Sequence, residues 1–295
     1  MDITYDYYRI FYYVAKYGSF SAAASVLLKG QPNITKTINN LESQLGCRLF
    51  IRSNRGAVLT AEGEKLYRHA QIAFENLSRA EEEITAGINS DSGRVSIAAT
   101  ETALYGVLIS ALAKFSSEYP GVKIKLTNFN SPQSLEAVKN GVADFGVVTL
   151  LEKPESIYHV TKICDFREIL CCPKGYKYDP DSIFSGPYIS INRDSYTYKY
   201  HSDFLLSGGI KKEPDIEVAT SDQVLPLVKS GMGIGFISEF LANEALKNGD
   251  IEEIPLEKPP KKLSICLVTD KTKTLSAAAV RLRKYLCEPT CLKRG

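Results

Sequence analysis

The chain has 295 residues, of which 44% are hydrophobic and 24% are charged, and its formal net charge is +2. This composition is ordinary for a soluble protein with two or three domains. No apolar run approaches the roughly 18 residues of a membrane span, and the N-terminus lacks the basic-then-apolar order of a secretory signal. We therefore expect a cytoplasmic protein that does not enter a membrane.

The cysteines do not form the pattern of a disulfide framework. There are seven of them, an odd number scattered along a long chain, which favours reduced thiols. No zinc-type cysteine cluster appears. We expect no metal ion and no cofactor.

The first 30 residues predict two short helices. Apolar residues recur at helical spacing within residues 5–17, and Gly18 ends the run. Ser19 or Ser21 can cap a second, alanine-rich helix. A turn containing Gly30 follows it.

Residues 31–46 predict a helix with two unlike faces. One face is an apolar stripe at steps of four, three and four residues: Ile34, Ile38, Leu41 and Leu45. The opposite face carries short, amide or cationic side chains: Thr35, Lys36, Asn39, Asn40 and Ser43. Such groups suit base edges and phosphates. Alone, this pattern is that of an amphipathic surface helix, and its neighbours change the interpretation.

A capped helix, a short turn with glycine and a second helix with a polar face are typical of a helix-turn-helix, whose second helix enters the DNA major groove. Between residues 29 and 55 there are five Lys or Arg side chains and only one acidic residue, Glu42. The positive charge that DNA binding needs is thus local. The expected DNA contacts from the two helices are Ser19, Ser21, Gln31, Pro32, Asn33, Thr35, Lys36 and Asn39.

Two short strand-like runs, residues 48–52 and 57–59, flank a turn-rich segment and predict a hairpin wing. Arg52 and Arg55 lie at its tip, where a guanidinium can contact a phosphate or enter a narrow minor groove. Without the adjoining helices, two solvated arginines would be the simpler interpretation.

Residues 61–88 predict one long helix that Thr60 caps. Apolar residues recur along it with an average step of 3.5: Leu66, Ala70, Ala73, Leu77, Ala80 and Ile84. At 1.5 Å per residue it would be about 42 Å long, too long for a domain of about 60 residues to cover. We expect a homodimer through residues 61–89, with further assembly to a homotetramer left open. The alternative is a helix lying on its own chain.

The order and spacing of many residues between 8 and 68 match a known pattern. They are Phe11, Val14, Gly18, Ser19, Phe20, Ser21, Ala23, Ala24, Leu27, Gln31, Pro32, Thr35, Ile38, Leu41, Glu42, Leu45, Gly46, Leu49, Phe50, Arg52, Leu59, Thr60 and Gly63. In this arrangement the segment resembles the DNA-binding end of a LysR-type transcriptional regulator. The chain departs from the family pattern at Gly30, where many members have a serine before the Gln-Pro pair. A second departure is the Asn39-Asn40 pair on the polar face of the helix. Both bear on sequence preference more than on fold.

From Arg94 onward, short apolar strands alternate with helices, which indicates an α/β domain with mainly parallel crossovers. Strands are expected at 94–100, 122–129, 143–149, 215–220 and 233–238, and helices at 104–118, 131–140 and 221–230. The order strand, helix, strand occurs twice, with a similar tripeptide at residues 139–141 and 229–231. Two similar lobes are implied.

The family resemblance implies a two-lobed effector domain related to type 2 periplasmic binding proteins. Residues 158–173 and 261–270 look like strands that pass between the lobes, and a helix at 275–286 would return to the first lobe. The expected organisation is an all-α winged helix-turn-helix domain (1–60), a dimerisation helix (61–89) and an α/β effector domain (90–295). Lobe I would span about 94–160 and 269–295, and lobe II about 165–262.

Ligands of such sheets are expected at the carboxyl ends of strands, where helices offer free N–H groups. The sequence places polar residues there: Thr100, Glu101, Thr102, Ser131, Thr149, Ser195 and Thr220. They predict a small polar effector. Each Ser or Thr could instead be a simple helix cap. Glu101 would favour an amine or a neutral polar group over an anion.

Three other functions are less well supported. No nucleophile elbow, Walker loop or His-Glu-x-x-His motif indicates an enzyme. A solute-binding receptor would share the two lobes, but it would have no use for residues 1–60. A redox-responsive regulator could use Cys164, Cys171 and Cys172, although buried apolar cysteine is the commoner situation. We therefore predict a regulator that binds double-stranded promoter DNA under control of a small effector.

Overall fold

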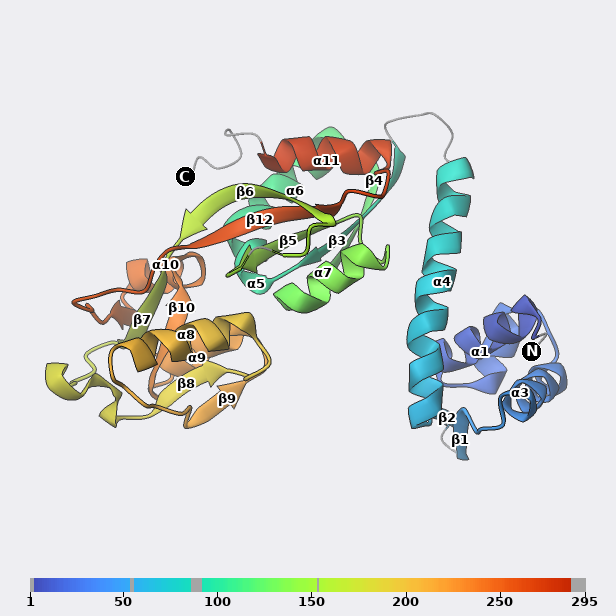
Figure 1. Cartoon of the computed structure of the whole chain (residues 1–295), viewed down its shortest axis with the longest axis horizontal. Coiled ribbons are helices and arrows are strands. Elements are labelled where there is room, and N and C mark those ends of the chain that lie inside the picture. Colours follow the sequence, from blue (N-terminus) through green and yellow to red (C-terminus); the bar gives the residue numbers. More distant parts are fainter. Residues whose placement is uncertain (1–2, 54–55, 86–91, 153, 288–295) are drawn as a thin grey trace. The chain divides into compact units, whose positions relative to one another are not determined.

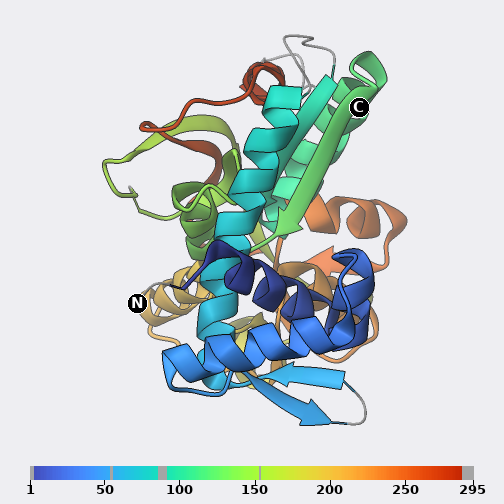
Figure 2. The ribbon, with the colours of Figure 1, turned by 90° about the vertical axis from the view of Figure 1, so that its right-hand side faces the viewer.

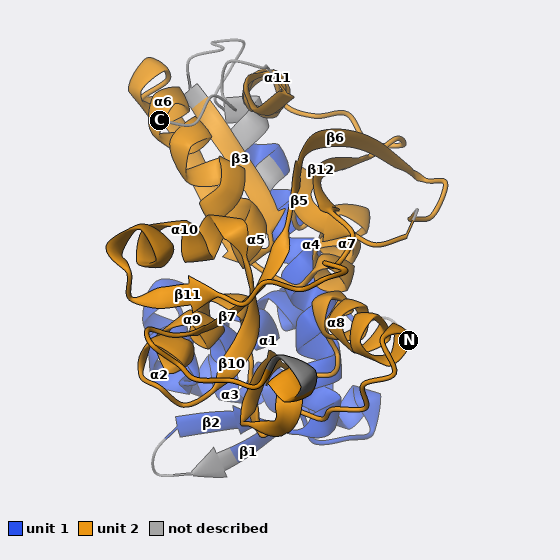
Figure 3. Cartoon of the chain, turned by 90° about the vertical axis from the view of Figure 1, so that its left-hand side faces the viewer, with its two compact units in different colours: residues 1–85 blue, residues 86–295 orange. Residues whose placement is uncertain are grey.

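The computed structural model describes residues 3–53, 56–85, 92–152 and 154–287. The chain divides into two compact units, residues 1–85 and residues 86–295 (Figure 1; Figure 3). The first unit combines short helices, one long helix and a hairpin. The second combines two five-stranded sheets with helices.

The elements of the first unit follow the prediction closely. They are α1 (Tyr5–Tyr17), α2 (Phe20–Val26), α3 (Gln31–Leu45), β1 (Phe50–Ser53), β2 (Gly56–Leu59) and α4 (Ala61–Thr85). Gly18 and Gly46 end α1 and α3 in the left-handed conformation, with φ of 60° and 70°; this conformation costs glycine little because it has no Cβ. Figure 2 shows α4 extending well beyond the short helices that pack near one of its ends.

The core of the first unit is built from the predicted apolar stripe of α3. Ile34, Ile38 and Leu41 are completely buried against α1 residues that include Ile10 and Phe11. Burying large apolar side chains of this kind contributes about 1.5–3 kcal/mol each. The stripe therefore fixes which face of α3 remains outside.

Glu42 lies beside this stripe and is buried, which the sequence analysis did not predict. One carboxylate oxygen of Glu42 accepts hydrogen bonds from the main-chain N–H groups of Leu49 and Phe50, at 2.8 and 3.1 Å. The other accepts one from the Arg48 guanidinium at 2.8 Å. Burial opposes ionisation, but the Leu49 N–H, the Arg48 side chain and the Phe50 N–H outweigh it, so the pKa of Glu42 is lowered. Glu42 thus joins α3 to the start of the hairpin.

Glu42→Ala is expected to reduce the free energy of unfolding by about 2 kcal/mol at neutral pH, because two buried N–H groups lose their acceptor. A lowered folded-state pKa stabilises the fold above the ordinary carboxyl pKa, and this contribution is lost as pH falls through the folded value. The difference between variant and wild type should therefore shrink in acid. Urea unfolding of the full chain at neutral and acidic pH measures it, and an equal difference at both would contradict a role for the ionised carboxylate.

The first sheet of the second unit has the strand order β4-β3-β5-β12-β6. Its strands are β3 (Ser92–Ala99), β4 (Gly121–Asn128), β5 (Phe145–Leu150), β6 (Tyr158–Phe166) and β12 (Leu263–Asp270). The strands β4, β3 and β5 are parallel, and β12 is antiparallel to β5 and β6. Helices α6 (Ile109–Glu118) and α11 (Ala277–Cys287) cover one face, and α7 (Ser131–Lys139) covers the other.

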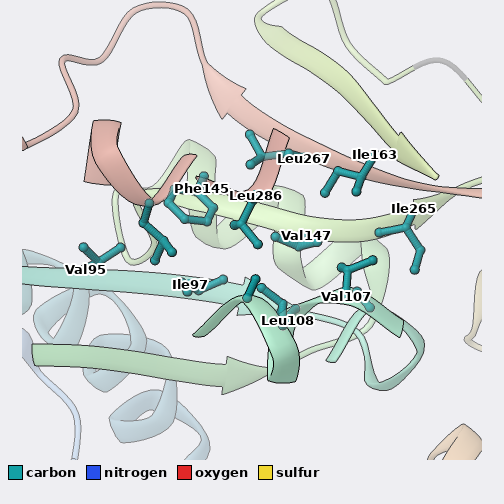
Figure 4. Packing of buried hydrophobic residues seen from close by; sticks show 14 of the residues in the cluster. Val95, Ile97, Val107, Leu108, Phe145, Val147, Ile163, Ile265, Leu267 and Leu286 are labelled. Atoms are coloured by element: carbon teal, nitrogen blue, oxygen red, sulfur yellow. The ribbon is translucent and has the colours of Figure 1, made fainter. Parts of the chain in front are cut away.

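Alternate residues of each strand build the two cores of this lobe. Ile97, Val147 and Leu267 pack on the face of α6 and α11 (Figure 4). Their neighbours Ala98 and Val148 pack on the face of α7. This is the two-residue period of a sheet that is buried on both sides.

The second sheet repeats the arrangement with the order β11-β7-β10-β8-β9. Its strands are β7 (Glu168–Pro173), β8 (Tyr188–Ile191), β9 (Ile216–Val218), β10 (Ile234–Ser238) and β11 (Ile251–Glu253), and its helices are α8 (Tyr196–Ser207), α9 (Val224–Lys229) and α10 (Glu239–Asn248). Short 3₁₀ turns, η2 (Pro180–Ser185) and η3 (Ser221–Gln223), complete it. As in the first sheet, three strands are parallel, here β9, β8 and β10.

The predicted lobe boundaries need correction. Residues 158–173 do pass between the lobes, but as two strands, with β6 wholly in the first sheet and β7 in the second. The expected second crossing strand, residues 261–270, does not cross, because β12 pairs with β5 and β6 along its whole length. Lobe I therefore runs to Phe166 and resumes at Leu263, instead of ending near 160 and resuming near 269. The sequence pattern located strands and could not assign them to a sheet.

The two lobes also meet beside the first strand-to-helix connection. There α5 (Glu101–Ala103) continues into a π-helical turn, η1 (Leu104–Leu108), and then into α6. A Cβ on Gly106 would lie 2.6 Å from the Phe240 ring of α10, so only glycine permits this approach. Phe240 in turn packs on Phe166 at a ring-centroid distance of 5.6 Å. The close contact lies in the continuous helical segment that begins directly after Thr100, its N-cap.

Within the described residues, none of the helices combines the length and the apolar character that a membrane span needs. The same part of the chain holds no group of His, Cys, Asp and Glu side chains arranged to bind a metal ion.

Candidate DNA interface and effector cavity

The polar face of α3 is exposed, as predicted. Six of its residues line one open depression: Gln31, Pro32, Thr35, Lys36, Asn39 and Asn40. Asn33 is also exposed at the N-terminal end of the helix. Since the apolar stripe on the opposite side is buried in the core, this polar face is the part of α3 that can enter a DNA major groove.

The two predicted serines of α2 have different positions. Ser19 is the N-cap of α2, and its Oγ accepts a hydrogen bond from the Ala22 N–H at 3.3 Å. Ser21 is exposed, and its Oγ donates to Oε1 of Gln31 at 3.1 Å. Ser21 therefore links the surface of α2 to the first residue of α3.

The structure reduces the local excess of positive charge. Lys29 forms an ion pair with Asp6 of α1 at 2.6 Å, and Arg48 forms one with Glu42. Lys36 is exposed, and no ion pair of this side chain occurs in the described part of the chain. Lys36 is thus the cation of α3 that remains available to a phosphate or a base.

The wing is confirmed as a hairpin, in which Arg52 of β1 pairs with Ala57 of β2. The Arg52 side chain and the whole of Arg55 lie outside the described residues. Their predicted DNA contacts therefore stay predictions.

The predicted apolar stripe of α4 is only partly covered by its own unit. Ala70 is buried in the core and Leu66 packs against it. Farther along the helix, Ala73, Leu77 and Ala80 are exposed, Leu77 with 46% of its surface. The side chain of Ile84 lies outside the described residues. The apolar stripe is therefore buried near the start of α4 and exposed farther along the helix.

A cavity of about 190 Å³ lies between the two lobes of the second unit. All seven residues that the sequence analysis chose as effector ligands line it: Thr100, Glu101, Thr102, Ser131, Thr149, Ser195 and Thr220. They come from the carboxyl ends of β3 and β5, the start of α7 and the connections after β8 and β9. In Figure 1, α5 and α7 lie on the side of the first lobe that faces α8.

Several of these side chains do serve as helix caps. The Thr100 Oγ1 accepts a hydrogen bond from the Ala103 N–H at 3.3 Å, and the Ser195 Oγ accepts one from the Thr197 N–H at 3.2 Å. Ser131 differs, because its Oγ donates to the main-chain oxygen of Thr149 at 2.6 Å. Capping and lining the cavity are compatible, since each cap brings the first turn of its helix to the cavity wall.

Ten further residues line the cavity besides these seven: Asn128, Phe129, Asn130, Gln133, Ile191, Asn192, Tyr196, Thr197, Ala219 and Ser221. Of these, Ser221 stands beside Thr220 among the hydroxyls that the sequence places after a strand, and the other nine were not predicted. Asn130 and Gln133 form a capping box at the start of α7, a signal readable from the Asn-x-x-Gln spacing. Asn192 follows β8, a strand that the sequence analysis did not identify. The Asn128 amide donates a hydrogen bond to the Glu101 carboxylate.

The cysteines of the proposed redox alternative do not form a reactive group. Cys171 and Cys172 are buried in different core clusters, on opposite faces of the second sheet. Burial raises the pKa of both thiols, which lowers the fraction of reactive thiolate. Cys164 is partly buried in β6 of the other lobe. None of these features favours redox sensing.

Comparison with protein-family models gives two matches. The model described as "LysR substrate binding domain" matches residues 89–288. The model described as "Bacterial regulatory helix-turn-helix protein, lysR family" matches residues 5–64. Together they cover both units.

Comparison with curated proteins gives relatives that match along most or all of their length. The chain is 27% identical over 304 residues to "Uncharacterized HTH-type transcriptional regulator YeiE" of Escherichia coli K12, with 100% of both chains covered. It is 24% identical to "Probable RuBisCO transcriptional regulator" of Cyanidium caldarium, over 95% of this chain and 92% of that protein.

Solved structures share the fold. CbnR, titled a LysR family transcriptional regulator, matches with a TM-score of 0.73 and 20% identity over 99% of this chain and 100% of that one. Full-length CbnR complexed with its target DNA matches with a TM-score of 0.72 and 21% identity, over 96% of this chain and 98% of that one. AphB of Vibrio cholerae matches with a TM-score of 0.61 and 18% sequence identity, over 96% of this chain and 98% of that one.

Proposed function

Because the chain belongs to the LysR family of transcriptional regulators, we propose that α3 reads promoter DNA and that a small polar effector in the interlobe cavity controls this binding. The chain is a DNA-binding transcriptional regulator of this family. We propose which residues contact DNA, what kind of effector binds and how the subunits assemble. This function requires the protein to share the cytoplasm with its DNA.

The observation that carries the proposed DNA contacts is the division of α3 into two faces. Ile34, Ile38 and Leu41 are buried, so the helix can present only its polar face. On that face Gln31 and Asn39 offer amides that can pair with adenine, and Lys36 offers a cation for guanine or phosphate. The residues proposed to contact DNA are those of the polar face of α3, together with Ser19, Ser21 and the wing residues Arg52 and Arg55.

Lys36→Ala is expected to weaken binding of the full chain to its DNA about tenfold and to reduce the slope of log affinity against log salt by about one for each helix engaged. Fluorescence anisotropy at several salt concentrations measures both quantities. The duplex can be selected by the wild-type protein from a random pool.

Lys114→Ala is a matched control, because it removes the same charge from an exposed position on α6 of the effector domain. This variant should bind DNA like the wild type. If Lys36→Ala had the same affinity and salt slope as Lys114→Ala, the polar face of α3 would not be the reading face.

We propose that the regulator is a homodimer through α4. The support is the exposed continuation of the apolar stripe through Ala73, Leu77 and Ala80, which a second copy of the same helix can cover at the observed 3.5-residue period. A dimer places two α3 helices on two half-sites.

Effector control follows from a cavity whose walls belong to different lobes. Thr100, Ser131 and Thr149 come from the first lobe, whereas Ser195 and Thr220 come from the second. A ligand that contacts both walls binds more tightly at one lobe spacing than at another. This difference in affinity is what lets an effector shift a conformational equilibrium.

A further inference from the structure

The interlobe cavity contains one formal charge. Among the residues that line it, all in the described part of the chain, Glu101 is the single acidic side chain and none is Lys, Arg or His. Glu101 is partly exposed, and it accepts a hydrogen bond from the Asn128 amide. An amide orients a carboxylate and leaves its negative charge in place. A bound effector therefore meets an uncompensated negative charge on the first lobe.

Two hydroxyls are in position to hydrogen-bond a ligand. Thr102 and Thr149 are each more than nine-tenths buried and line the cavity. Within the described chain, neither hydroxyl has a hydrogen-bond partner. A hydroxyl both donates and accepts, so each of these groups can hydrogen-bond a polar group of a molecule in the cavity. The two hydroxyls therefore suit a polar ligand.

The first turns of two full-length helices also line the cavity. Ser131 and Gln133 belong to α7, which has nine residues, and Tyr196 and Thr197 belong to α8, which has twelve. The first N–H groups of a helix have no intrahelical acceptor, and the helix dipole adds partial positive charge at this end. The Gln133 and Thr197 N–H groups already donate to the caps Asn130 and Ser195, and Pro132 has no N–H. A ligand would therefore meet the N–H groups of Ser131 and Tyr196. These turns suit a carboxylate, and they lie on different lobes.

We propose that the effector is a small zwitterion of the α-amino acid type, with its ammonium group at Glu101 and its carboxylate at the first turns of α7 and α8. This inference rests on the proposed function of the cavity. The cavity volume of about 190 Å³ is larger than the roughly 150 Å³ of a protein cavity that holds a benzene molecule, so the cavity can accommodate a small amino acid. The Thr102 hydroxyl can accept from the ammonium group, and the Thr149 hydroxyl can donate to the carboxylate.

Other ligand classes satisfy fewer of these groups. A dianion would find no basic side chain on the cavity wall and would be repelled by Glu101. A simple amine would satisfy Glu101 but would place its charge near two helix N-termini without a carboxylate to meet them. A neutral polyol would leave Glu101 without a cation. Only a molecule with both charges complements both parts of the cavity.

The test uses three sets of probes with the full-length protein and isothermal titration calorimetry. The amino acids are L-alanine, L-serine, L-threonine and L-glutamine. Each is compared with its 2-hydroxy acid, which lacks the ammonium group, and with its amino acid amide, which lacks the carboxylate. At least one amino acid is expected to bind at least tenfold more tightly than both of its matched compounds. The proposal is overturned if the hydroxy acids or amides bind equally well, or if none of the four amino acids binds at about 10 mM.

Glu101→Gln tests the assigned residue, since it removes the charge and keeps an acceptor for Asn128. We expect this variant to lose at least tenfold in affinity for the amino acid and to bind the 2-hydroxy acid no more weakly than the wild type does. Glu118→Gln, at an exposed position at the end of α6, is the matched control and should bind the amino acid normally. Equal losses in both variants would overturn the role of Glu101.

Binding to the selected duplex without any added amino acid separates this inference from the proposed function. If the wild type binds DNA but none of the amino acids binds as expected, the proposed effector class is wrong and the proposed DNA-binding function is unaffected. Failure to bind any duplex would instead contradict the proposed function itself.

Discussion

Replacing Gly63 by alanine is expected to unfold the DNA-binding unit at temperatures where the wild type is folded. A Cβ at this position in the first turn of α4 would lie 2.2 Å from the main-chain oxygen of Leu49. That oxygen cannot move away freely, because it accepts a hydrogen bond from the Thr60 N–H at 3.0 Å, and the Leu49 side chain is buried. The backbone itself must shift, at a cost of about 3 kcal/mol or more.

This cost is a large part of the total stability of a small domain, which is about 5–15 kcal/mol. The melting temperature of the first unit should fall by more than about 10 °C, and DNA binding should be lost with it. Circular dichroism of the full chain during heating, together with anisotropy on the selected duplex, measures both effects. The second unit should keep its own transition.

Gly30→Ala is the matched control for this substitution. Gly30 is the N-cap of α3 with φ of −67°, and the nearest atom to a Cβ there is Cδ of Pro32 at 3.7 Å. The same chemical change in the same unit should cost less than about 1 kcal/mol. If Gly63→Ala were as stable as Gly30→Ala, the close approach of α4 to Leu49 would be wrong.

The fold of the first unit could be predicted almost completely because its signals are local. The stripe of α3 repeats within one helix, and Gly18 and Gly46 end their helices with the left-handed conformation that glycine favours. Thr60 caps α4 through its Oγ1, which accepts from the Gly63 N–H at 3.0 Å. Each of these features depends on residues a few positions apart, and such spacings are visible in a sequence.

The features that could not be predicted depend on residues distant in the chain. Lys29 pairs with Asp6 of another helix, so its charge is less available to DNA than a count of charges implies. Glu42 was counted as a lone acidic residue, because its contacts with Arg48 and with the Leu49 and Phe50 N–H groups form only when the start of the hairpin packs beside α3. Gly63 fits the family pattern, but its role is a contact with Leu49 that no spacing shows.

The cavity was predicted in part for a clear physical reason. A residue after a parallel strand lies at the same edge of the sheet as the residues after its neighbours, so Thr100 and Thr149 could be grouped once their strands were recognised. Asn192 was missed because its strand, β8, was not recognised. The lobe crossing was misplaced because pairing of β12 with β6 is set by tertiary contacts.

The second large effect is expected for Leu77→Glu on the exposed part of α4. In a dimer the proposed stripe would bury Leu77 against the partner helix, and a carboxylate there would be buried without a compensating charge. The full-length protein should become monomeric. Because two linked reading helices gain about 10²–10⁴ in avidity over one, affinity for the selected duplex should fall at least about a hundredfold. Light scattering with size-exclusion chromatography gives the mass, and anisotropy gives the affinity.

Ser78→Glu separates the position from the charge. Ser78 is exposed and neighbours Leu77, but it lies about 100° farther around the helix and therefore off the stripe. The Ser78→Glu variant should have a particle mass and an affinity for the selected duplex close to those of the wild type. A Leu77→Glu protein that kept the dimer mass would exclude this stripe as the interface. A monomeric variant with full DNA affinity would instead show that the stripe holds the dimer together and that one α3 is sufficient for binding.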